Sequence, residues 1–250
     1  MSLPKVSVVV PTYQRPELLR RALASIGNHE WQETIVIDDD PAMSGASVVI
    51  DFPGVRYFSK RGFERGLANS RNIALSLVRG RYVCFLDDDD YFLPDGLSYL
   101  YSATQSGKSF YYGNFRYVRR DSIQIRSLES THQRQLLVIN EIPVGAYLIE
   151  RSSIRHLFDG AMKSHEDWDF LLKNIDWADV EYVSHEIAAI DKTHDDESSM
   201  LVRRRQHFWI EFLSVYSKFP ASNHLEARIK MLESLGVSVP RGLFTNDNIF

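Results

Sequence analysis

Four consecutive carboxylates, Asp87, Asp88, Asp89 and Asp90, are the strongest chemical signal in this sequence. They directly follow residues 83–86, a short apolar run typical of a buried strand. Adjacent unpaired carboxylates repel one another and lose hydration on burial, so this cluster predicts a bound cation. Their oxygen atoms favour Mg²⁺ or Mn²⁺, which commonly bind through one or two carboxylates together with substrate phosphates. The alternative is a solvated acidic turn that leads into a helix at Pro94.

Two further polar segments follow predicted strands. The first contains Pro11, Thr12 and Tyr13, and the second contains Asp38, Asp39 and Asp40. The first segment would supply an aromatic ring for stacking, and the second a carboxylate for a base or ribose. The aspartates after residue 86 would supply ligands for a metal bound to a diphosphate. Together they predict a nucleotide site. The alternative for the second segment alone is a turn followed by Pro41.

The elements that would position these segments alternate between strands and helices. Apolar runs predict strands near residues 6–10, 34–37, 55–59 and 82–86, and helical spacing predicts helices near 16–26 and 66–78. This alternation favours an α/β fold with a parallel sheet covered on both faces. Ligands of open α/β sheets bind beyond the carboxyl ends of the strands, so we expect the three polar segments to converge at one edge.

Composition excludes several other classes of protein. The chain has 250 residues, of which 44% are hydrophobic and 25% charged, as in ordinary globular proteins. Its net charge of −4 argues against nucleic acid as a partner. The single cysteine, Cys84, excludes an internal disulfide and fits a reducing compartment. With neither a signal-peptide pattern nor an apolar run of 18 residues, we expect a cytoplasmic protein.

The N-terminal part resembles glycosyltransferase family 2, an inverting family with the GT-A fold. The resemblance lies in residues 8–15 (VVVPTYQR), 35–39 (IVIDD), 66–72 (GLANSRN) and 85–90 (FLDDDD). Gln14 stands where the family usually has Asn, and Asp40-Pro41 stands in place of the usual Gly-Ser. The resemblance implies an α/β GT-A fold, a Rossmann-like core whose mostly parallel central sheet is flanked by helices.

The implied domain organisation has two parts. Residues 1–196 would form the GT-A domain, with a nucleotide-sugar-binding half at 1–105 and an acceptor-binding half at 106–196. Residues 197–250 would form a C-terminal helical extension.

The resemblance also implies roles for individual residues. The donor nucleotide would contact Pro11, Thr12, Tyr13, Arg15, Asp38, Asp39, Arg71, Asp87 and Asp88. Asp87 and Asp89 would hold Mn²⁺ or Mg²⁺, and the base would most often be uracil. Two alternatives remain open here: Tyr13 packs the first loop, and Arg71 is a surface helix residue paired with Glu64.

A second acidic pair begins a predicted helix in the other half of the chain. Trp168, Leu171, Leu172 and Ile175 recur at helical spacing, and Ser164 and Asp167 form a capping-box pattern. In the resembling family, a Glu-Asp pair at such a position contributes the catalytic base. The resemblance therefore implies Asp167 as the base, with Glu166 as its support or substitute. The alternative is that Asp167 merely caps the helix.

Two features near the C-terminus have competing interpretations. His194 follows a predicted strand at 183–190, and relatives with a histidine near this point use it to complete the metal site; the alternative is an exposed loop histidine. Beyond residue 197 we expect helices. There Arg203, Arg204 and Arg205 precede aromatic residues, a pattern that suits contact with an anionic membrane surface. The alternative is that the aromatics pack on the core and the arginines face water.

The leading hypothesis is a metal-dependent, inverting glycosyltransferase. It would move a sugar from a nucleotide sugar, by family habit a UDP-sugar, to a hydroxyl of a glycan or lipid-linked glycan in bacterial surface-polysaccharide assembly, such as O-antigen or capsule. The protein would be cytoplasmic or peripheral at the inner face of the membrane. The alternatives are a sugar-phosphate nucleotidyltransferase and an inactive subunit that binds nucleotide sugar. A nucleotidyltransferase would need a glycine-rich loop after the first strand. Loss of Asp89 or Asp167 would support an inactive subunit. The sequence carries no indication of oligomeric state.

Overall fold

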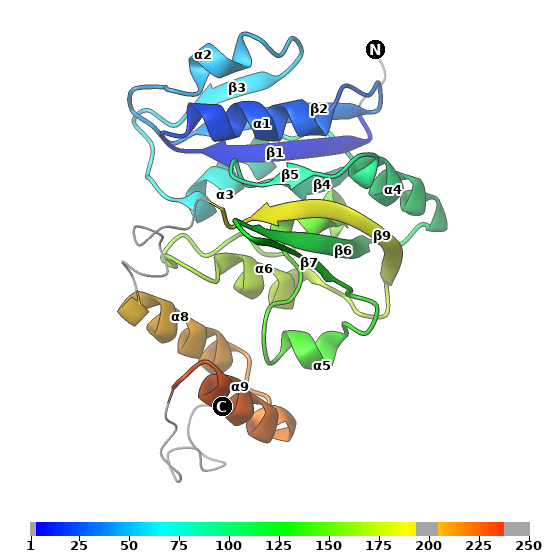
Figure 1. Ribbon diagram of the computed structural model, residues 1–250, viewed down its shortest axis with the longest axis vertical. Coiled ribbons are helices and arrows are strands. Elements are labelled where there is room, and N and C mark those ends of the chain that lie inside the picture. The colour runs from blue at the N-terminus through cyan, green and yellow to red at the C-terminus, as the bar shows by residue number, and fades with distance from the viewer. Residues whose placement is uncertain (1–3, 194–204, 238–250) are drawn as a thin grey trace.

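The framework of the protein is one continuous β-sheet (Figure 1). The computed structural model describes residues 4–193 and 205–237. The sheet has the strand order β3-β2-β1-β4-β8-β6-β9-β5, and β7 pairs with β6. The strands are β1 (Val6–Thr12), β2 (Gln32–Asp38), β3 (Arg56–Ser59), β4 (Tyr82–Phe85), β5 (Tyr91–Phe92), β6 (Phe110–Arg119), β7 (Ser122–Arg126), β8 (Tyr147–Glu150) and β9 (Val180–Asp191).

The two halves of the sheet differ in strand direction. β3, β2, β1 and β4 are mutually parallel, as the sequence predicts for the first half. Beyond β4 the sheet is mixed, because β8 runs antiparallel to β4 and β6 while β6 and β9 are parallel. In the parallel half, Thr12 lies opposite Asp38 in register. The carboxyl ends of β1, β2 and β4 therefore meet at one edge, which confirms the predicted convergence.

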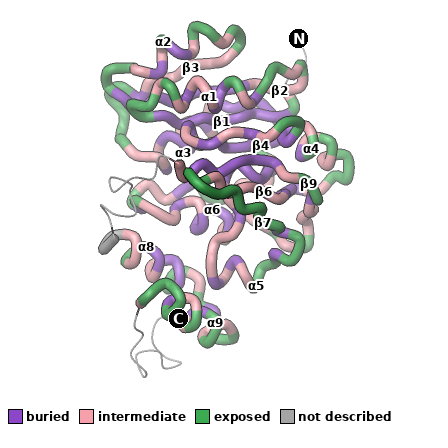
Figure 2. The backbone as a smooth tube through the Cα atoms, in the orientation of Figure 1, coloured by how far each residue is buried: buried purple, intermediate pink, exposed green. Residues whose placement is uncertain are grey.

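Helices cover both faces of the sheet. They are α1 (Pro16–Ile26), α2 (Ala46–Val49), α3 (Leu67–Leu77), α4 (Gly96–Ala103), α5 (Gln133–Leu136), α6 (Glu166–Asn174), α8 (Arg205–Lys218) and α9 (Leu225–Ser234). Alternation along β1 separates two cores, since successive side chains of a strand point to opposite faces. Val8 and Val10 pack with residues of α1, α2 and α4, whereas Val9 packs with residues of α3, α6 and α8. Figure 2 shows that β1 and β4 are buried throughout, while β7 is exposed along its length.

Helix α6 forms where the sequence predicts it, but its start differs from the prediction. The residue before the helix is His165, whose backbone is left-handed with φ of 59°. The Ser164 hydroxyl donates to Glu211 at 2.8 Å. The predicted capping box is therefore wrong, because Glu211 of another helix accepts from the serine. Asp167 lies inside the first turn of α6, where its Oδ1 accepts the Trp168 amide hydrogen at 2.8 Å. The carboxylate therefore satisfies one amide at the helix start, as the capping alternative expects, although without the capping box.

Helices α8 and α9 confirm the predicted helical structure near the C-terminus. In Figure 1 α8 lies next to α6 and α9 lies beyond α8, at the end of the molecule opposite β3 and α2. Phe212 and Tyr216 of α8 are buried in the core that also contains Trp168 of α6. Packing on the core thus accounts for these aromatics; Arg203 and Arg204 lie outside the described residues. Among the helices that the structure describes, none combines the length and apolar character needed to cross a bilayer.

Candidate functional site

The four carboxylates after β4 divide into a cluster and a structural residue. Asp87, Asp89 and Asp90 each place one carboxylate oxygen within 4.8 Å of the others. Asp88 is instead buried against the end of β1, where it accepts a hydrogen bond from Thr12 Oγ1 at 2.7 Å and pairs with Arg15 at 2.6 Å. Asp88 therefore ties β4 to the loop after β1. Its burial raises its pKa to about 7, against the opposing effect of Arg15.

The donor atoms of this cluster fit a hard divalent cation, because all are carboxylate oxygens. Asp90 is buried and accepts the Asp191 amide hydrogen at 2.9 Å. Burial and the charges of Asp89 and Asp87 raise the pKa of Asp90 well above its ordinary value. A cation would relieve that repulsion. Asp90 was missing from the predicted ligands, although its place in the acidic run was a sufficient signal.

Asp38 has a structural role in the loop after β2. Its carboxylate is completely buried and accepts hydrogen bonds from the amides of Asp40 and Gly45 and from the Tyr57 hydroxyl, each at 2.8 Å. A Cβ on Gly45 would lie 2.9 Å from Asp38 Oδ2, so glycine allows this close approach. These bonds give Asp38 a role in shaping the loop, and its predicted contact with the nucleotide stays a prediction.

Asp39 remains at the edge where its role was predicted. Its side chain is 13% exposed, accepts the Gly66 amide hydrogen at 2.8 Å and pairs with Lys60 at 3.1 Å. Lys60 is itself buried and also donates to the Gly66 carbonyl and the Ser70 hydroxyl. Lys60 was missed, because a lysine after a strand gives no sign in the sequence that it will be buried. It fixes Asp39 beside the start of α3.

The loop after β1 presents an aromatic ring and an arginine. Tyr13 is 40% exposed, and the Arg65 guanidinium carbon lies 4.7 Å from the centre of its ring. The ring is thus accessible for stacking, whereas the preceding Pro11 is buried at the end of β1. Arg15 pairs with Asp89 at 2.6 Å as well as with Asp88. This arginine therefore lies directly at the acidic cluster.

Arg71 of α3 joins the acidic cluster to α6. Its guanidinium is buried and forms two ion pairs, one with Asp87 at 2.7 Å and one with Glu166 at 2.8 Å. The surface pairing with Glu64 is therefore wrong as an explanation of Arg71. Burial alone would lower the pKa of Arg71, but the two carboxylates outweigh it and raise that pKa above its ordinary value.

Glu166 and Asp167 have different surroundings at the start of α6. Glu166 is buried, and burial raises its pKa to about 7; Arg71 opposes this shift and the charge of Asp167 adds to it. Asp167 is half-buried and accepts a hydrogen bond from Asn140 Nδ2 at 3.0 Å. Asn140 was missed by the sequence analysis, since its position in a loop carries no signal of this contact. His194, the predicted third metal ligand, lies outside the described residues.

Comparison with known families gives one match to a family model. The model described as Glycosyl transferase family 2 matches residues 7–158, which is more than half of the chain.

Two characterised relatives are bacterial. The GalNAc(5)-diNAcBac-PP-undecaprenol beta-1,3-glucosyltransferase of Campylobacter jejuni is 36% identical over 118 residues, which cover 45% of this chain and 38% of the relative. The UDP-Glc:alpha-D-GlcNAc-diphosphoundecaprenol beta-1,3-glucosyltransferase WfgD of Escherichia coli is 29% identical over 122 residues, covering 47% and 48% of the two chains. The chain thus spans less than half the length of either relative.

A solved structure shares the fold over nearly the whole chain. It is S. aureus TarS 1-349 in complex with UDP-GlcNAc, with a TM-score of 0.66 and 17% identity. The match covers 94% of this chain and 76% of TarS 1-349. At this identity the likeness shows the fold, and it extends into the part of the chain beyond residue 158.

Proposed function

The chain belongs to glycosyl transferase family 2, and from this premise we propose that it transfers a sugar from a UDP-sugar to a hydroxyl group of a lipid-linked glycan, with inversion at the anomeric carbon. The names of the two bacterial relatives support an undecaprenol-linked acceptor. UDP-Glc in the name of WfgD and UDP-GlcNAc in the TarS complex support a UDP-sugar donor. A lipid-linked acceptor would place the protein peripherally at the inner face of the membrane.

The observation that carries this proposal is the buried bridge made by Arg71. Its two ion pairs connect Asp87 in the acidic cluster with Glu166 at the start of α6. Inverting transfer is a single displacement, which needs charge stabilisation on the leaving side and a base on the attacking side. The bridge links Asp87, in the candidate metal cluster of the leaving side, to Glu166, next to the candidate base of the attacking side.

On the acceptor side, Asp167 would act as the general base. Its carboxylate is half-buried at the start of α6, and Asn140 holds one of its oxygens. It would take the proton of the acceptor hydroxyl as that oxygen attacks the anomeric carbon. Glu166 would support it by fixing the first turn of α6 to Arg71.

On the donor side, Asp39 would hydrogen-bond the base while Tyr13 stacks on it. Arg71 and Arg15 would lie near the nucleotide, and Thr12 and Asp88 would hold the loop after β1 in place, next to the buried Pro11. Asp87 and Asp89, joined by Asp90, would hold Mg²⁺ or Mn²⁺, which when bound stabilises negative charge on the departing diphosphate.

The first experiment is a thermal-shift screen of UDP, UDP-sugars and other nucleotide sugars, each with and without Mn²⁺. A ligand that binds the native state raises the melting temperature by mass action. We expect a shift with UDP-sugars that Mn²⁺ enlarges, and loss of the Mn²⁺ effect in Asp89→Ala. Loss of even an outer-shell partner weakens metal binding about 10- to 100-fold, so loss of this ligand should weaken Mn²⁺ binding at least as much.

The control is Asp121→Ala, which removes an exposed carboxylate from the turn between β6 and β7. This variant should shift like the wild type. Transfer itself is then followed by NMR of the glycoside formed from the best donor. A product that keeps the donor's anomeric configuration, or no shift with any nucleotide in the presence of Mn²⁺, would contradict the proposal.

A further inference from the structure

We propose that α8 and α9 position the catalytic base by holding both the helix that carries Asp167 and the segment that carries its partner Asn140. This inference rests on the proposed function, because it takes Asp167 as the base. Both helices lie beyond residues 7–158, the part of the chain that the family model matches. Four sets of contacts carry the inference.

The first contact is made by Glu211 of α8 with the loop before α6. Its carboxylate accepts the Lys163 amide hydrogen at 2.8 and 2.9 Å and the Ser164 hydroxyl at 2.8 Å. It also accepts the Ser164 amide hydrogen. These donors lie two and three residues before Glu166. Glu211 therefore fixes the backbone at the point where the catalytic helix begins.

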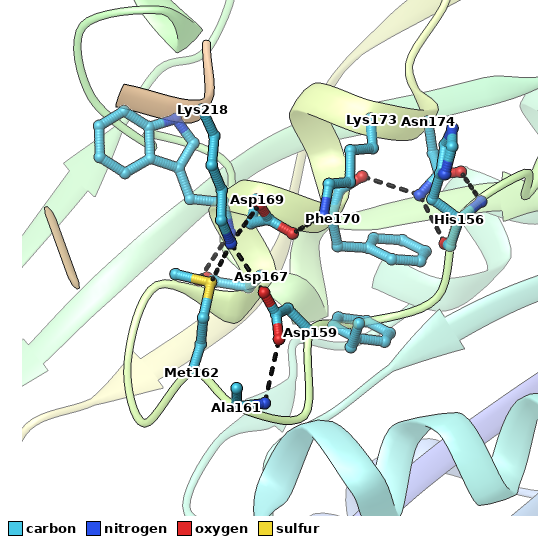
Figure 3. A network of polar contacts seen from close by, with 12 residues as sticks. His156, Asp159, Ala161, Met162, Asp167, Asp169, Phe170, Lys173, Asn174 and Lys218 are labelled. Carbon is cyan, nitrogen blue, oxygen red and sulfur yellow. Dashed lines mark hydrogen bonds and ion pairs between the residues drawn. The ribbon is translucent and has the colours of Figure 1, made fainter. Parts of the chain in front are cut away.

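The second contact is made by Lys218 at the end of α8 with Asp169 (Figure 3). Asp169 is completely buried one turn into α6, and its carboxylate pairs with Lys218 at 3.1 Å and with Lys173 at 2.6 Å. Lys218 also pairs with Asp159 at 2.8 Å in the loop that leads to α6. Because a buried carboxylate is costly without a partner, this lysine ties the end of α8 to the first turn of α6.

Between these polar anchors, aromatic rings of the two helices pack together. The His165 ring lies 4.4 Å from that of Phe208, and the Trp168 ring lies 5.0 Å from that of Phe212. The two α6-side residues flank Glu166 and Asp167 in sequence. The residues around the base are therefore packed against α8 as well as hydrogen-bonded to it.

The fourth set of contacts fixes the segment that leads to Asn140. The Tyr216 hydroxyl of α8 donates to the Val138 carbonyl at 2.7 Å. The Arg228 Nε of α9 donates to the Leu137 carbonyl at 2.9 Å, and its guanidinium carbon lies 4.1 Å from the ring of Tyr216. Asn140, two residues after Val138, donates to Asp167. The extension thus holds the donor of this hydrogen bond as well as its acceptor.

The contacts of α8 and α9 with both α6 and the segment before Asn140 would affect turnover. A general base works only when it lies within hydrogen-bond reach of the proton it removes. A misplacement of about 1 Å by a change far from the chemistry can lower the rate about 100-fold. Glu211 and Lys218 are thus positioning residues that would act on turnover through Asp167, while the donor edge of the sheet stays unchanged.

The test uses Glu211→Ala, with Glu211→Gln as the conservative variant and Glu226→Ala as the matched control. Gln keeps one acceptor oxygen, and Glu226 lies exposed on α9, where it pairs with Lys230. For Glu211→Ala we expect turnover to fall about 10- to 100-fold while the KM for donor and the affinity for UDP stay unchanged. Glu211→Gln should recover part of that loss, and Glu226→Ala should match the wild type.

A second readout does not depend on activity. Amide hydrogen exchange in residues 163–170 should become faster in Glu211→Ala. If that variant fails to fold, the same measurement is made on Lys218→Met, where exchange should also become faster. Unchanged exchange there, or a loss of UDP affinity that parallels the loss of turnover, would overturn the inference. If the wild type transfers no sugar from any donor, the proposed function fails, and the exchange and UDP-binding measurements still decide whether the extension holds α6 without disturbing the donor edge.

Discussion

The donor edge of the sheet and the start of α6 both present carboxylates, but the protein positions them by different means. At the donor edge, Thr12 and Asp88 meet because β1 and β4 are neighbouring parallel strands. At the start of α6, Asp167 is held by Asn140, and the helix itself by residues of α8. One site is thus organised by the sheet and the other by side chains from distant segments. The bridge of Arg71 connects the two.

The two regions also differ in how their charge is balanced. At the donor edge, burial and then the charges of Asp89 and Asp87 raise the pKa of Asp90, and the carboxylates of Asp87, Asp89 and Asp90 lie together. Around α6, cations of the protein already face the acids: Arg71 pairs with Glu166, and Lys218 with Asp169. The three clustered carboxylates of the donor edge are therefore suited to an added cation, whereas Asp169 of the base helix already pairs with Lys173 and Lys218. Each of the following variants tests this contrast.

The largest effect is expected from Asp167→Asn. Asparagine keeps the size of the side chain and can still accept from Asn140, but it cannot take a proton from the acceptor hydroxyl. We expect turnover to fall about 10²- to 10⁴-fold, the range that general-base catalysis contributes. UDP binding with Mn²⁺ should stay unchanged, because the donor edge is held by other contacts. Kinetics and calorimetry of the same preparation check both parts, and transfer at near wild-type rate would refute the assignment of the base.

The next effect is expected from Arg71→Met, which cuts the connection between the two regions. At pH 8, where Glu166 is ionised, removal of one partner from a buried pair should cost about 3–5 kcal/mol of unfolding free energy. Urea denaturation measures this loss. The double variant Arg71→Met/Glu166→Gln should recover part of it, since no buried charge is then left unpaired. Equal stability of the single and double variants would show that the bridge does not couple the regions.

The surface pair of Arg20 with Asp51 provides the control for that experiment. Exposed ion pairs contribute about 0–1 kcal/mol, so Arg20→Met should leave the unfolding free energy nearly unchanged. A loss in Arg20→Met as large as that in Arg71→Met would mean that burial of the bridge is not the cause.

Much of the donor edge could be predicted from sequence, because it follows from strand periodicity. Alternating and continuous apolar runs place β1, β2 and β4, and the polar residues after them must share an edge of a parallel sheet. The role of Asp38 could not be predicted in this way, since it depends on Tyr57 and on the close approach of Gly45. The local sequence pattern predicts where a residue lies in the fold, but the residues that contact it in the tertiary structure determine which of its atoms remain available for a ligand.

The surroundings of α6 were less predictable, because their contacts span long stretches of chain. Helical spacing located the helix, but Ser164 and Asp167 matched a capping box that the fold does not form. The true partner of Ser164 is Glu211, 47 residues further along the chain. Likewise, Arg71 meets Glu166 across 95 residues. No periodicity encodes such pairs. The sequence therefore pointed to Glu166, Asp167 and Arg71 but not to the pairing between Arg71 and Glu166, and it gave no sign of the roles of Asn140, Glu211 and Lys218.

A smaller effect is expected from pH, through the carboxyl group of Glu166. Burial raises its folded-state pKa from 4.5 to about 7. The folded protein therefore binds this proton more tightly than the unfolded chain, so the contribution to stability is complete below about pH 4.5 and is lost as pH rises through 7. Turnover should change in the opposite direction and rise through pH 7, because the ionised carboxylate holds α6 to Arg71 more strongly.

Glu166→Gln separates this ionisation from the others. The amide cannot titrate, so the rise of turnover near pH 7 should disappear, and unfolding free energy should lose its decline between pH 4.5 and 7. Initial rates and urea midpoints measured across this range check both expectations. Persistence of the same rise in Glu166→Gln would assign it to another group.

The smallest effect is expected from Arg15→Gln at the donor edge. Arg15 is half-exposed and pairs with Asp88 and Asp89, and of these Asp89 belongs to the acidic cluster, so Arg15 competes with a cation for that carboxylate. Exposed pairs contribute about 0–1 kcal/mol, and removal of this one should tighten binding of Mn²⁺ alone by a factor of up to about five. Binding of UDP in the presence of Mn²⁺ should weaken if Arg15 also contacts the nucleotide, as the family resemblance implies.

Titration of free Mn²⁺ by electron paramagnetic resonance measures the first part without any nucleotide. Arg20→Gln, which removes a cation from α1 away from the acidic cluster, is the control and should leave Mn²⁺ affinity unchanged. Tighter Mn²⁺ binding in Arg15→Gln alone would sharpen the contrast between an edge that accepts an added cation and a helix balanced by its own. Weaker binding would mean that Arg15 organises the carboxylates for the metal, and the donor edge would then depend on a side-chain partner just as α6 does.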